Sequence, residues 1–396
     1  MNKKQASQVS RIKVSEIRDI ADRVSAVMTQ VRETMLPPNA RKSPPTFSSA
    51  QLGEICNLDK TKLDYQIKKN VLPQGEMIGG RRKFCLTDVQ TWSKAMRAKR
   101  LRPAGVDATV LCVANFKGGV TKTTTAVTLA QGMSLRGHKV LVIDTDPQGS
   151  ATTLFGILPD TEVTEDQTIL PLCSGEQVSI DSAIQSTYWD GIDIVAAAPI
   201  LYSAEFILPS RQSKQPQGGG FEFWRVLDHG IDTVRDKYDV IIIDTPPSLS
   251  YTTINAILAS DGIIMPLPPS ALDFASSSQF WDLFSSLTED LFERGGKSKE
   301  FDFIDILLTR VDTNDAAVSV VREWISAAYG AMVLSVDVPK TALTANASAE
   351  FGTVYDVDTS TISPRTYRRA YDAYERVVDL VEDQIFNGWQ RKLGDI

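Results

Sequence analysis

Residues 110–125 read Val-Leu-Cys-Val-Ala-Asn-Phe-Lys-Gly-Gly-Val-Thr-Lys-Thr-Thr-Thr. The apolar run 110–114 predicts a buried β-strand and residues 124–136 predict a helix, with a basic, glycine-rich loop between them. Two adjacent glycines let backbone N–H groups turn toward an anion, and the positive end of the helix dipole adds to the attraction. The order strand, loop, helix therefore predicts a phosphate-binding loop.

The residue types in this loop fit a nucleoside triphosphate bound with Mg²⁺. Lys122 supplies a mobile positive charge for the β- and γ-phosphates, and the Thr123 hydroxyl is the expected Mg²⁺ ligand. The alternative interpretation is a Gly-Gly turn with incidental lysines. We expect the nucleotide to contact Lys117, Gly118, Gly119, Val120, Thr121, Lys122, Thr123 and Thr124.

The spacing of the loop departs from the ordinary Walker A pattern, because Phe116 and Thr121 stand where that pattern has glycines. With a second lysine, Lys117, directly before the paired glycines, the loop resembles that of the ParA/MinD family of ATPases. The resemblance implies that Lys117 crosses a dimer interface to the partner's nucleotide and acts in catalysis with Lys122. Thr121 replaces the glycine that is commoner at that position in the family.

Two further apolar runs each end in an aspartate. Residues 139–143 precede Asp144 and Asp146, and residues 240–243 precede Asp244. Acidic residues at the carboxyl ends of parallel strands lie beside the nucleotide in doubly wound sheets. The same resemblance identifies these segments as the Walker A′ and Walker B motifs. It implies that Asp146 aligns the attacking water, while Asp144 and Asp244 hold Mg²⁺ together with Thr123. Loop and strand-capping aspartates are the alternative interpretation.

Strands and helices alternate over residues 108–396, which predicts an α/β domain with a doubly wound, mostly parallel sheet. Two smaller parts precede this domain: an amphipathic helix with a linker (residues 1–45) and a second domain (residues 46–107). The apolar stripe of the first helix can pack on its own domain or on a second chain, and the sequence leaves both open. Residues 304–308 predict one of the later strands of the sheet. Thr309 and Arg310 end it, where related ATPases place groups near the adenine.

The net charge of −7 hides an asymmetry along the chain. Residues 1–104 hold 21 Lys and Arg against 9 Asp and Glu, a net +12, and the remainder holds 21 against 40, a net −19. A basic N-terminal segment suggests contacts with phosphate backbones, whereas the acidic remainder argues against broad attraction to nucleic acid outside a local patch. The four cysteines are scattered and no apolar run is long enough to span a bilayer, as expected of a cytoplasmic protein.

Residues 46–96 predict a helix, a turn, a second helix, a basic wing and a third helix. This order resembles the winged helix-turn-helix of MerR-like regulators, which the longer plasmid-type ParA proteins also carry. A small helical dimerisation domain with a solvated basic loop is the alternative. On the DNA-binding interpretation, the second helix lies in the major groove and the wing holds phosphates. The residues expected at DNA are Lys60, Lys62, Tyr65, Lys68, Arg81, Arg82 and Lys83.

The last segment, residues 363–389, predicts a helix whose first turns carry Arg365, Arg368 and Arg369. Three arginines within an acidic domain can hold DNA phosphates without sequence preference, as resembling residues do in ParA dimers. A solvated helix start is the alternative. The rest of the helix is largely acidic, which disfavours a membrane-surface helix of the MinD kind.

These motifs together favour an ATP-dependent DNA partition ATPase. The resemblance implies an ATP-closed homodimer with slow hydrolysis to ADP, nonspecific DNA binding in the ATP state, and stimulation by a ParB-type centromere-binding partner. We further expect operator binding and autoregulation through the winged domain, no membrane partner, and a cytoplasmic, nucleoid-associated location. The alternative is a nucleotide-gated transcriptional repressor that moves no cargo. An iron–sulfur reductase shares the loop but requires paired cysteine ligands, which the sequence does not supply.

Overall fold

The computed structural model describes residues 13–35, 42–214, 221–293, 299–340, 352–356 and 363–394. The chain divides into two compact units, Met1–Ser43 and Pro44–Ile396. The first unit contains the 3-10 helix η1 (Val14–Glu16) and the helix α1 (Ile17–Met35). Its apolar side chains at helical spacing are exposed to solvent, among them those of Val14, Ile17, Ile20, Val24 and Val27.

The second unit begins with three helices and a small antiparallel sheet of strand order β1-β3-β2. Ser48 and Gln51 form a capping box at the start of the first helix, and the Asp59 carboxylate accepts a hydrogen bond from the backbone N–H of Lys62 at the start of the second. Trp92 and Phe84 are fully buried in the core beneath them. These elements are β1 (Phe47–Ser48), α2 (Ser49–Ile55), α3 (Lys60–Lys69), β2 (Glu76–Ile78), β3 (Arg81–Phe84), α4 (Leu86–Met96) and η2 (Ala98–Arg100).

An eight-stranded sheet follows, in the order β11-β10-β9-β4-β8-β5-β7-β6. Every neighbouring pair is parallel except β6 and β7. The central strands are buried on both faces, which explains their continuous apolar sequences. The strands are β4 (Thr109–Val113), β5 (Val140–Asp144), β6 (Gln185–Ser186), β7 (Ile192–Val195), β8 (Val240–Asp244), β9 (Gly262–Leu267), β10 (Phe303–Val311) and β11 (Val333–Pro339). The predicted doubly wound, mostly parallel α/β fold is confirmed.

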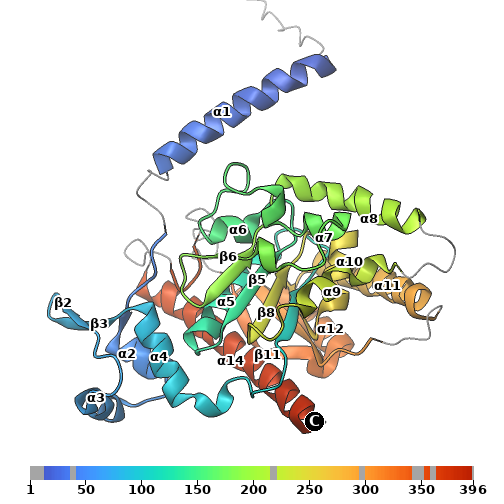
Figure 1. The fold of residues 1–396 in the computed structure, drawn as a ribbon. Coiled ribbons are helices and arrows are strands. Elements are labelled where there is room, and N and C mark those ends of the chain that lie inside the picture. Colours follow the sequence, from blue (N-terminus) through green and yellow to red (C-terminus); the bar gives the residue numbers. More distant parts are fainter. Residues whose placement is uncertain are drawn as a thin grey trace, which may run out of the picture. The chain divides into compact units, whose positions relative to one another are not determined.

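Helices cover both faces of this sheet (Figure 1). Leu111 and Val113 of β4 pack on the side of α5 and α14, whereas Val110 and Cys112 pack on the side of α9, α10 and α11. The α-helices are α5 (Lys122–Leu135), α6 (Ser150–Leu154), α7 (Leu170–Ser174), α8 (Ala204–Ser213), α9 (Val226–Asp232), α10 (Tyr251–Ala259), α11 (Ala271–Glu293), α12 (Ala316–Tyr329) and α14 (Pro364–Gly394). The 3-10 helices are η3 (Glu165–Gln167), η4 (Asp181–Ala183), η5 (Pro199–Ser203), η6 (Phe223–Arg225) and η7 (Gly330–Met332).

The strand order brings the sequence motifs together at one edge of the sheet. β8 lies between β4 and β5, and the register pairs Asp244 with Val113 on one side and with Asp144 on the other. The loop after β4 and the aspartates that end β5 and β8 therefore meet at the carboxyl ends of three adjacent strands. This is the edge at which doubly wound sheets bind ligands.

Candidate nucleotide site and DNA-binding surfaces

The loop between β4 and α5 is fixed by its own side chains and by left-handed backbone. Asn115 donates through Nδ2 to the carbonyl of Pro266 at 2.8 Å and accepts the backbone N–H of Lys117 at 3.0 Å. Gly119 and Thr121 have φ values of +73° and +74°. Glycine adopts this conformation at little cost, but threonine does so under strain. The threonine that replaces the family's commoner glycine thus takes a glycine-like conformation.

Lys122, the first residue of α5, folds back over the loop. Its ammonium donates to the carbonyl of Lys117 at 3.0 Å, and the residue is only 7% exposed. Burial lowers the pKa of Lys122, although the charges of Asp244 and Asp146 oppose the shift. A buried, partly desolvated cation at the start of a helix is suited to an anionic ligand.

The three aspartates at the sheet edge are buried but differ in their hydrogen bonds. Asp144 accepts the backbone N–H of Thr152 at 2.9 Å, its hydroxyl at 2.8 Å, and the N–H of Asp146 at 3.1 Å. Burial raises the pKa of Asp144 to about 7 despite the hydrogen bonds from Thr152. Asp146 accepts the backbone N–H of Gln148 at 2.9 Å, and burial raises its pKa as well.

Asp244 is fully buried, and neither of its carboxylate oxygens has a hydrogen-bond partner among the described residues. Burial, followed by the charge of Asp144, raises the pKa of Asp244 well above its ordinary value. Thr123 and Lys122 act in the opposite direction and lower it. Burial outweighs these two groups, and a bound cation would further stabilise the charged carboxylate.

A cavity of about 400 Å³ lies over the phosphate loop. Its lining contains Lys122, Asp146 and most of the expected nucleotide contacts, whereas Lys117 and Val120 do not line it. The sequence interpretation missed Ser150, Thr153, Leu154, Pro247 and Gly352. The first three follow the Asp144–Asp146 segment and Pro247 follows Asp244, so their motifs could have indicated them. The full lining is Gly118, Gly119, Thr121, Lys122, Thr123, Thr124, Asp146, Ser150, Thr153, Leu154, Pro247 and Gly352.

Lys117 points away from the phosphate loop in this structure. Its ammonium forms an ion pair of 2.8 Å with Asp273, in the first turn of α11, and its side chain is 37% exposed. Asp273 also accepts a hydrogen bond from the hydroxyl of Ser270. The sequence interpretation missed Asp273, because nothing local to it marks a partner at the start of the phosphate loop.

Comparisons with known proteins agree with this geometry. Residues 108–294 match a family model described as an AAA domain. The chain is 30% identical over 384 residues to a putative replication protein A of Rhizobium rhizogenes, covering 94% of both chains. It is 29% identical to protein SopA of Escherichia coli (strain K12), covering 88% of this chain and 90% of SopA. The chain belongs to the ParA/SopA/RepA-type plasmid partition ATPases.

Two solved structures resemble this partition ATPase in fold. A structure titled Partition Protein covers 94% of this chain and 97% of its own, with a TM-score of 0.64 and 20% identity. Cobyrinic acid a,c-diamide synthase from Mycobacterium smegmatis, with bound ATP analogue and magnesium, covers 69% of this chain and 93% of its own. That comparison has a TM-score of 0.53 and 25% identity. Over the residues described for this ATPase, no helix has both the length and the apolar character that crossing a bilayer requires.

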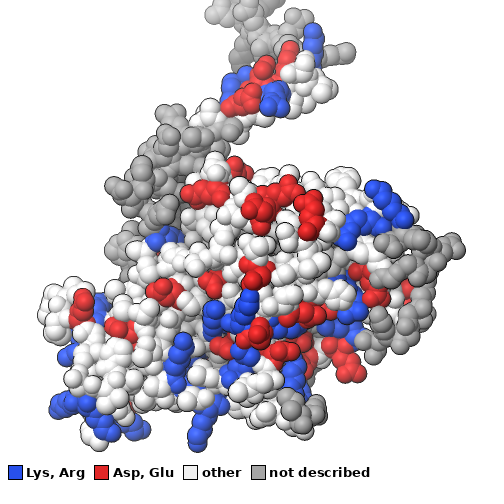
Figure 2. All heavy atoms as spheres, viewed as in Figure 1, with Lys and Arg blue, Asp and Glu red and all other residues white. Residues whose placement is uncertain are grey.

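The winged part of this ParA-type ATPase, which consists of the elements from β1 to η2, exposes most of the residues expected at DNA. Lys60, Lys62, Tyr65 and Lys68 lie on the solvent side of α3, opposite the buried Leu63 and Ile67. Lysine and arginine side chains gather over this region in Figure 2. In the wing, Arg81 is exposed and Lys83 is half-buried, while the Arg82 guanidinium donates to the carbonyl of Gln74. Arg82 therefore braces the wing, a role that the sequence did not predict.

The arginines of α14 have different surroundings. Arg368 is engaged in two ion pairs, to Glu54 of α2 at 3.1 Å and to Asp372 at 2.8 Å. Arg369 instead lines a groove of about 450 Å³ between α14 and the ends of β10 and β11. Arg376, about two helical turns further along α14, lines the same groove and was missed by the sequence interpretation. Arg365 is exposed at the helix start.

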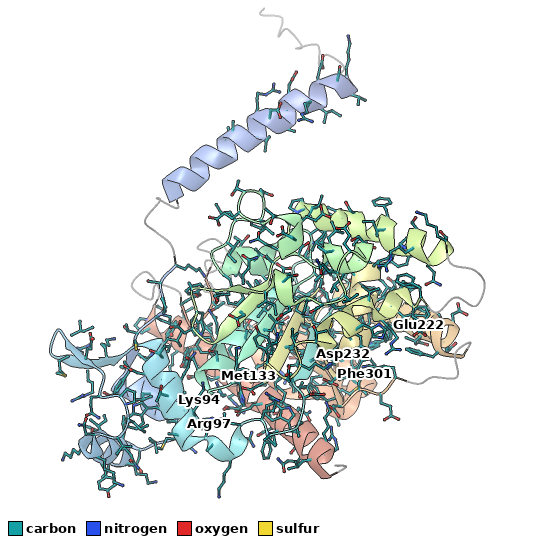
Figure 3. All side chains as sticks on the ribbon, in the orientation of Figure 1. Lys94, Arg97, Met133, Glu222, Asp232 and Phe301 are labelled. Carbon is teal, nitrogen blue, oxygen red and sulfur yellow. The ribbon has the colours of Figure 1, made fainter. Side chains whose placement is uncertain are left out.

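Helix α4 of the winged part packs against the nucleotide-binding part through polar contacts. Gln90 donates to the hydroxyl of Ser134 at 2.7 Å, and the Ser93 hydroxyl donates to the carbonyl of Leu135 at 2.6 Å, both at the end of α5. Figure 3 labels Arg97 at the end of α4. Its guanidinium pairs with the buried Glu382 of α14. The helix that begins at the phosphate loop therefore ends against the winged part.

Proposed function

We propose that this partition ATPase binds ATP with Mg²⁺ at the phosphate loop and uses the bound nucleotide to control its contact with DNA. The observation that carries this proposal is the buried Asp244 carboxyl, which has no hydrogen-bond partner among the described residues and ends the strand beside the loop. Such a group is retained when it serves a ligand.

The residues at the sheet edge fit Mg²⁺. Thr123 would hold the ion and Asp244 would hold it through water, with Asp144 supporting them, and the ion would neutralise charge on the β- and γ-phosphates when bound. The described residues include no group of three or more His, Cys, Asp or Glu side chains arranged to hold a metal ion. Nucleotide oxygens would therefore complete the coordination. The ATP analogue and magnesium in the diamide synthase structure support this assignment.

Each remaining residue has one role in this proposal. The loop N–H groups and Lys122 stabilise the charge that spreads over the transferred phosphoryl group. Asp146 lines the cavity and orients the attacking water. Lys117 leaves Asp273 and reaches the nucleotide of a second copy of the chain when an ATP-closed homodimer forms. Hydrolysis yields ADP and phosphate.

Calorimetric titration with ADP, with and without Mg²⁺, tests the site. For the wild-type protein we expect Mg²⁺ to strengthen ADP binding by about tenfold or more. Asp244→Asn should lose this enhancement, and its melting temperature without nucleotide should rise because a fully buried carboxyl with a raised pKa is replaced by a neutral amide. Asp107→Asn, an exposed substitution just before β4, is the control and should bind like the wild type. An undiminished Mg²⁺ effect in Asp244→Asn would contradict the proposal.

We further propose two DNA contacts. In the ATP state, Arg365, Arg369 and the neighbouring Arg376 hold duplex phosphates without sequence preference, while Arg368 is partly occupied by its ion pairs. The winged part reads an operator through Lys60, Lys62, Tyr65 and Lys68 of α3, and Arg81 and Lys83 hold phosphates beside it. Contacts between α4 and the end of α5 give the nucleotide site a direct route to the winged part, which supports nucleotide-gated autoregulation.

A ParB-type, centromere-bound partner would stimulate hydrolysis, and the protein would work on the nucleoid in the cytoplasm. Membership of the partition family supports a partner of this kind. The alternative remains a nucleotide-gated transcriptional repressor that moves no cargo. The two functions differ in one property, because only the partition ATPase needs DNA binding by its ATP-bound nucleotide domain.

A further inference from the structure

Strand β10 ends in a bulge beside the phosphate loop. Its register with β11 pairs Leu308 with Asp337 and then Val311 with Pro339. Between these two pairs, β10 therefore contains one residue more than β11. Arg310 lies within the bulge at φ +55°, in the left-handed region that arginine rarely occupies. Bulges of this kind change the direction of a side chain, and strained backbone at the edge of a site is retained when the surroundings hold it.

The bulge directs two consecutive side chains at two consecutive carbonyls of the phosphate loop. The buried hydroxyl of Thr309 donates to the carbonyl of Val120 at 3.2 Å. The guanidinium of Arg310 donates to the carbonyl of Gly119 at 3.0 Å. Both donors come from residues about 190 positions further along the chain, so the contact is a tertiary one.

Holding these carbonyls also fixes the N–H groups of the same peptides. In a trans peptide the N–H points opposite to the C=O, so the anchored carbonyls of Gly119 and Val120 determine where the N–H groups of Val120 and Thr121 point. Thr121 is itself in left-handed backbone and lines the cavity. Without an external anchor, this strained segment would relax toward other conformations.

We propose that Thr309 and Arg310 form a clamp that sets the phosphate loop in its anion-binding conformation before nucleotide arrives. They are positioning residues, since they act through the loop backbone. The inference rests on the proposed nucleotide site and adds a determinant of its affinity. A pre-ordered loop spares the nucleotide the cost of ordering it, so the clamp strengthens binding more than it accelerates the chemical step.

Arg310→Gly is the decisive variant, because glycine adopts φ +55° without strain and removes only the side chain. We expect its melting temperature without nucleotide to stay level or rise. Its Kd for ADP with Mg²⁺ and its KM for ATP should each increase about fivefold to tenfold, with kcat within about twofold of wild type. Arg310→Lys keeps a cationic donor and should recover most of the affinity. Thr309→Val, which removes the other donor, should also raise Kd and KM.

Calorimetry on the full chain measures the Kd for ADP, and steady-state kinetics measure KM and kcat for ATP. Wild-type Kd and KM in Arg310→Gly overturn the clamp, and so does a fall in kcat with KM unchanged, because that pattern belongs to a residue acting on the transition state. Equal weakening by Arg310→Gly and Arg310→Lys also overturns it, since the donor would then be irrelevant. If the wild-type protein bound no ADP with Mg²⁺, the proposed nucleotide site itself would fail, and the clamp with it.

Discussion

Lys117 pairs with Asp273 in this structure, and in the proposed dimer it would instead contact the nucleotide of the second chain. Its ion pair with Asp273 holds the ammonium beside α11, and the side chain remains partly exposed. Lys117 does not itself line the cavity in this structure, so the proposed role in catalysis requires its side chain to move toward a second molecule. The lysine end of the pair is 37% exposed, whereas Asp273 is buried, so exchange of this pair for a phosphate would leave the Asp273 carboxylate without its cation.

Lys117→Ala should separate binding from turnover. We expect the variant to retain nucleotide affinity within about threefold, because Lys122 and the loop N–H groups remain, and to lose hydrolysis stimulated by DNA and the cognate partner protein. Calorimetry and a phosphate-release assay measure the two properties. Lys237→Ala breaks a more exposed lysine–aspartate pair, with Asp181, away from the phosphate loop and should change neither. Stimulated turnover at the wild-type level in Lys117→Ala would exclude the cross-dimer role.

Local spacing predicted the phosphate loop because its glycines and lysines are adjacent in the chain. It could not predict that Asp273 pairs with Lys117 or that Arg310, expected near the adenine, contacts the loop backbone, because the fold brings these pairs together from distant parts of the chain. Arg310 and Gly119 are separated by 191 positions. It also could not show that Arg82 braces the wing, because the spacing of three basic residues does not indicate which of them faces a backbone carbonyl.

At the scale of elements, α14 connects the two parts of the second unit. It packs against α5 on one side, and at its middle Glu382 accepts a hydrogen bond from Arg97 of the winged part and lies 2.9 Å from His138. Periodicity in the sequence predicted the helix and its acidic face. The pairing of that face with the basic end of α4 depends on tertiary packing and could not be predicted from the sequence.

The close approach of α5 and α14 depends on Gly132. A Cβ at this position would lie 2.5 Å from Cγ2 of Val378 and 3.0 Å from the hydroxyl of Tyr355. Gly132→Ala should therefore destabilise the protein by about 1–3 kcal/mol in chemical denaturation, despite alanine's better helix propensity. Adding Val378→Ala should restore part of the loss, because it removes the nearest atoms. A single variant as stable as the wild type would contradict this packing.

Glu382 makes the free energy of unfolding depend on pH. Burial raises the pKa of Glu382, but the hydrogen bond from His138 and the charge of Arg97 lower it more, to about 2. A lowered carboxyl pKa stabilises the folded state above the unfolded pKa, near 4.5, and this contribution is lost as the pH falls toward 2. At neutral pH it amounts to about 3 kcal/mol.

Glu382→Gln should accordingly lower the free energy of unfolding at pH 7 by up to about 3 kcal/mol, with the difference shrinking between pH 4.5 and pH 3. Urea denaturation at several pH values measures it. Asp383→Asn, which removes an exposed partner of Arg100, should cost less than about 1 kcal/mol. A difference between Glu382→Gln and wild type that stays constant with pH would show that the carboxylate charge is not responsible.

At the scale of the whole molecule, the basic segment of the chain is separate from the acidic segment that carries the phosphate loop. The first 104 residues are basic and the remainder is acidic, so the proposed DNA contact of the nucleotide domain would rely on a local group such as the α14 arginines. The sequence predicted this division and the family. It could not separate Arg368, which pairs with Glu54 314 positions away, from Arg369, which lines the groove.

Binding to random-sequence duplex DNA, measured with ATP, with ADP and without nucleotide at two salt concentrations, tests the partition function most directly. We predict that wild-type binding appears chiefly with ATP and weakens steeply with salt. Arg369→Ala should weaken it severalfold, and Arg368→Ala, the matched control, should weaken it less. Binding that is equal in all nucleotide states, unaffected by Arg369→Ala and abolished by Lys60→Ala with Arg81→Ala would contradict the partition ATPase and favour the repressor.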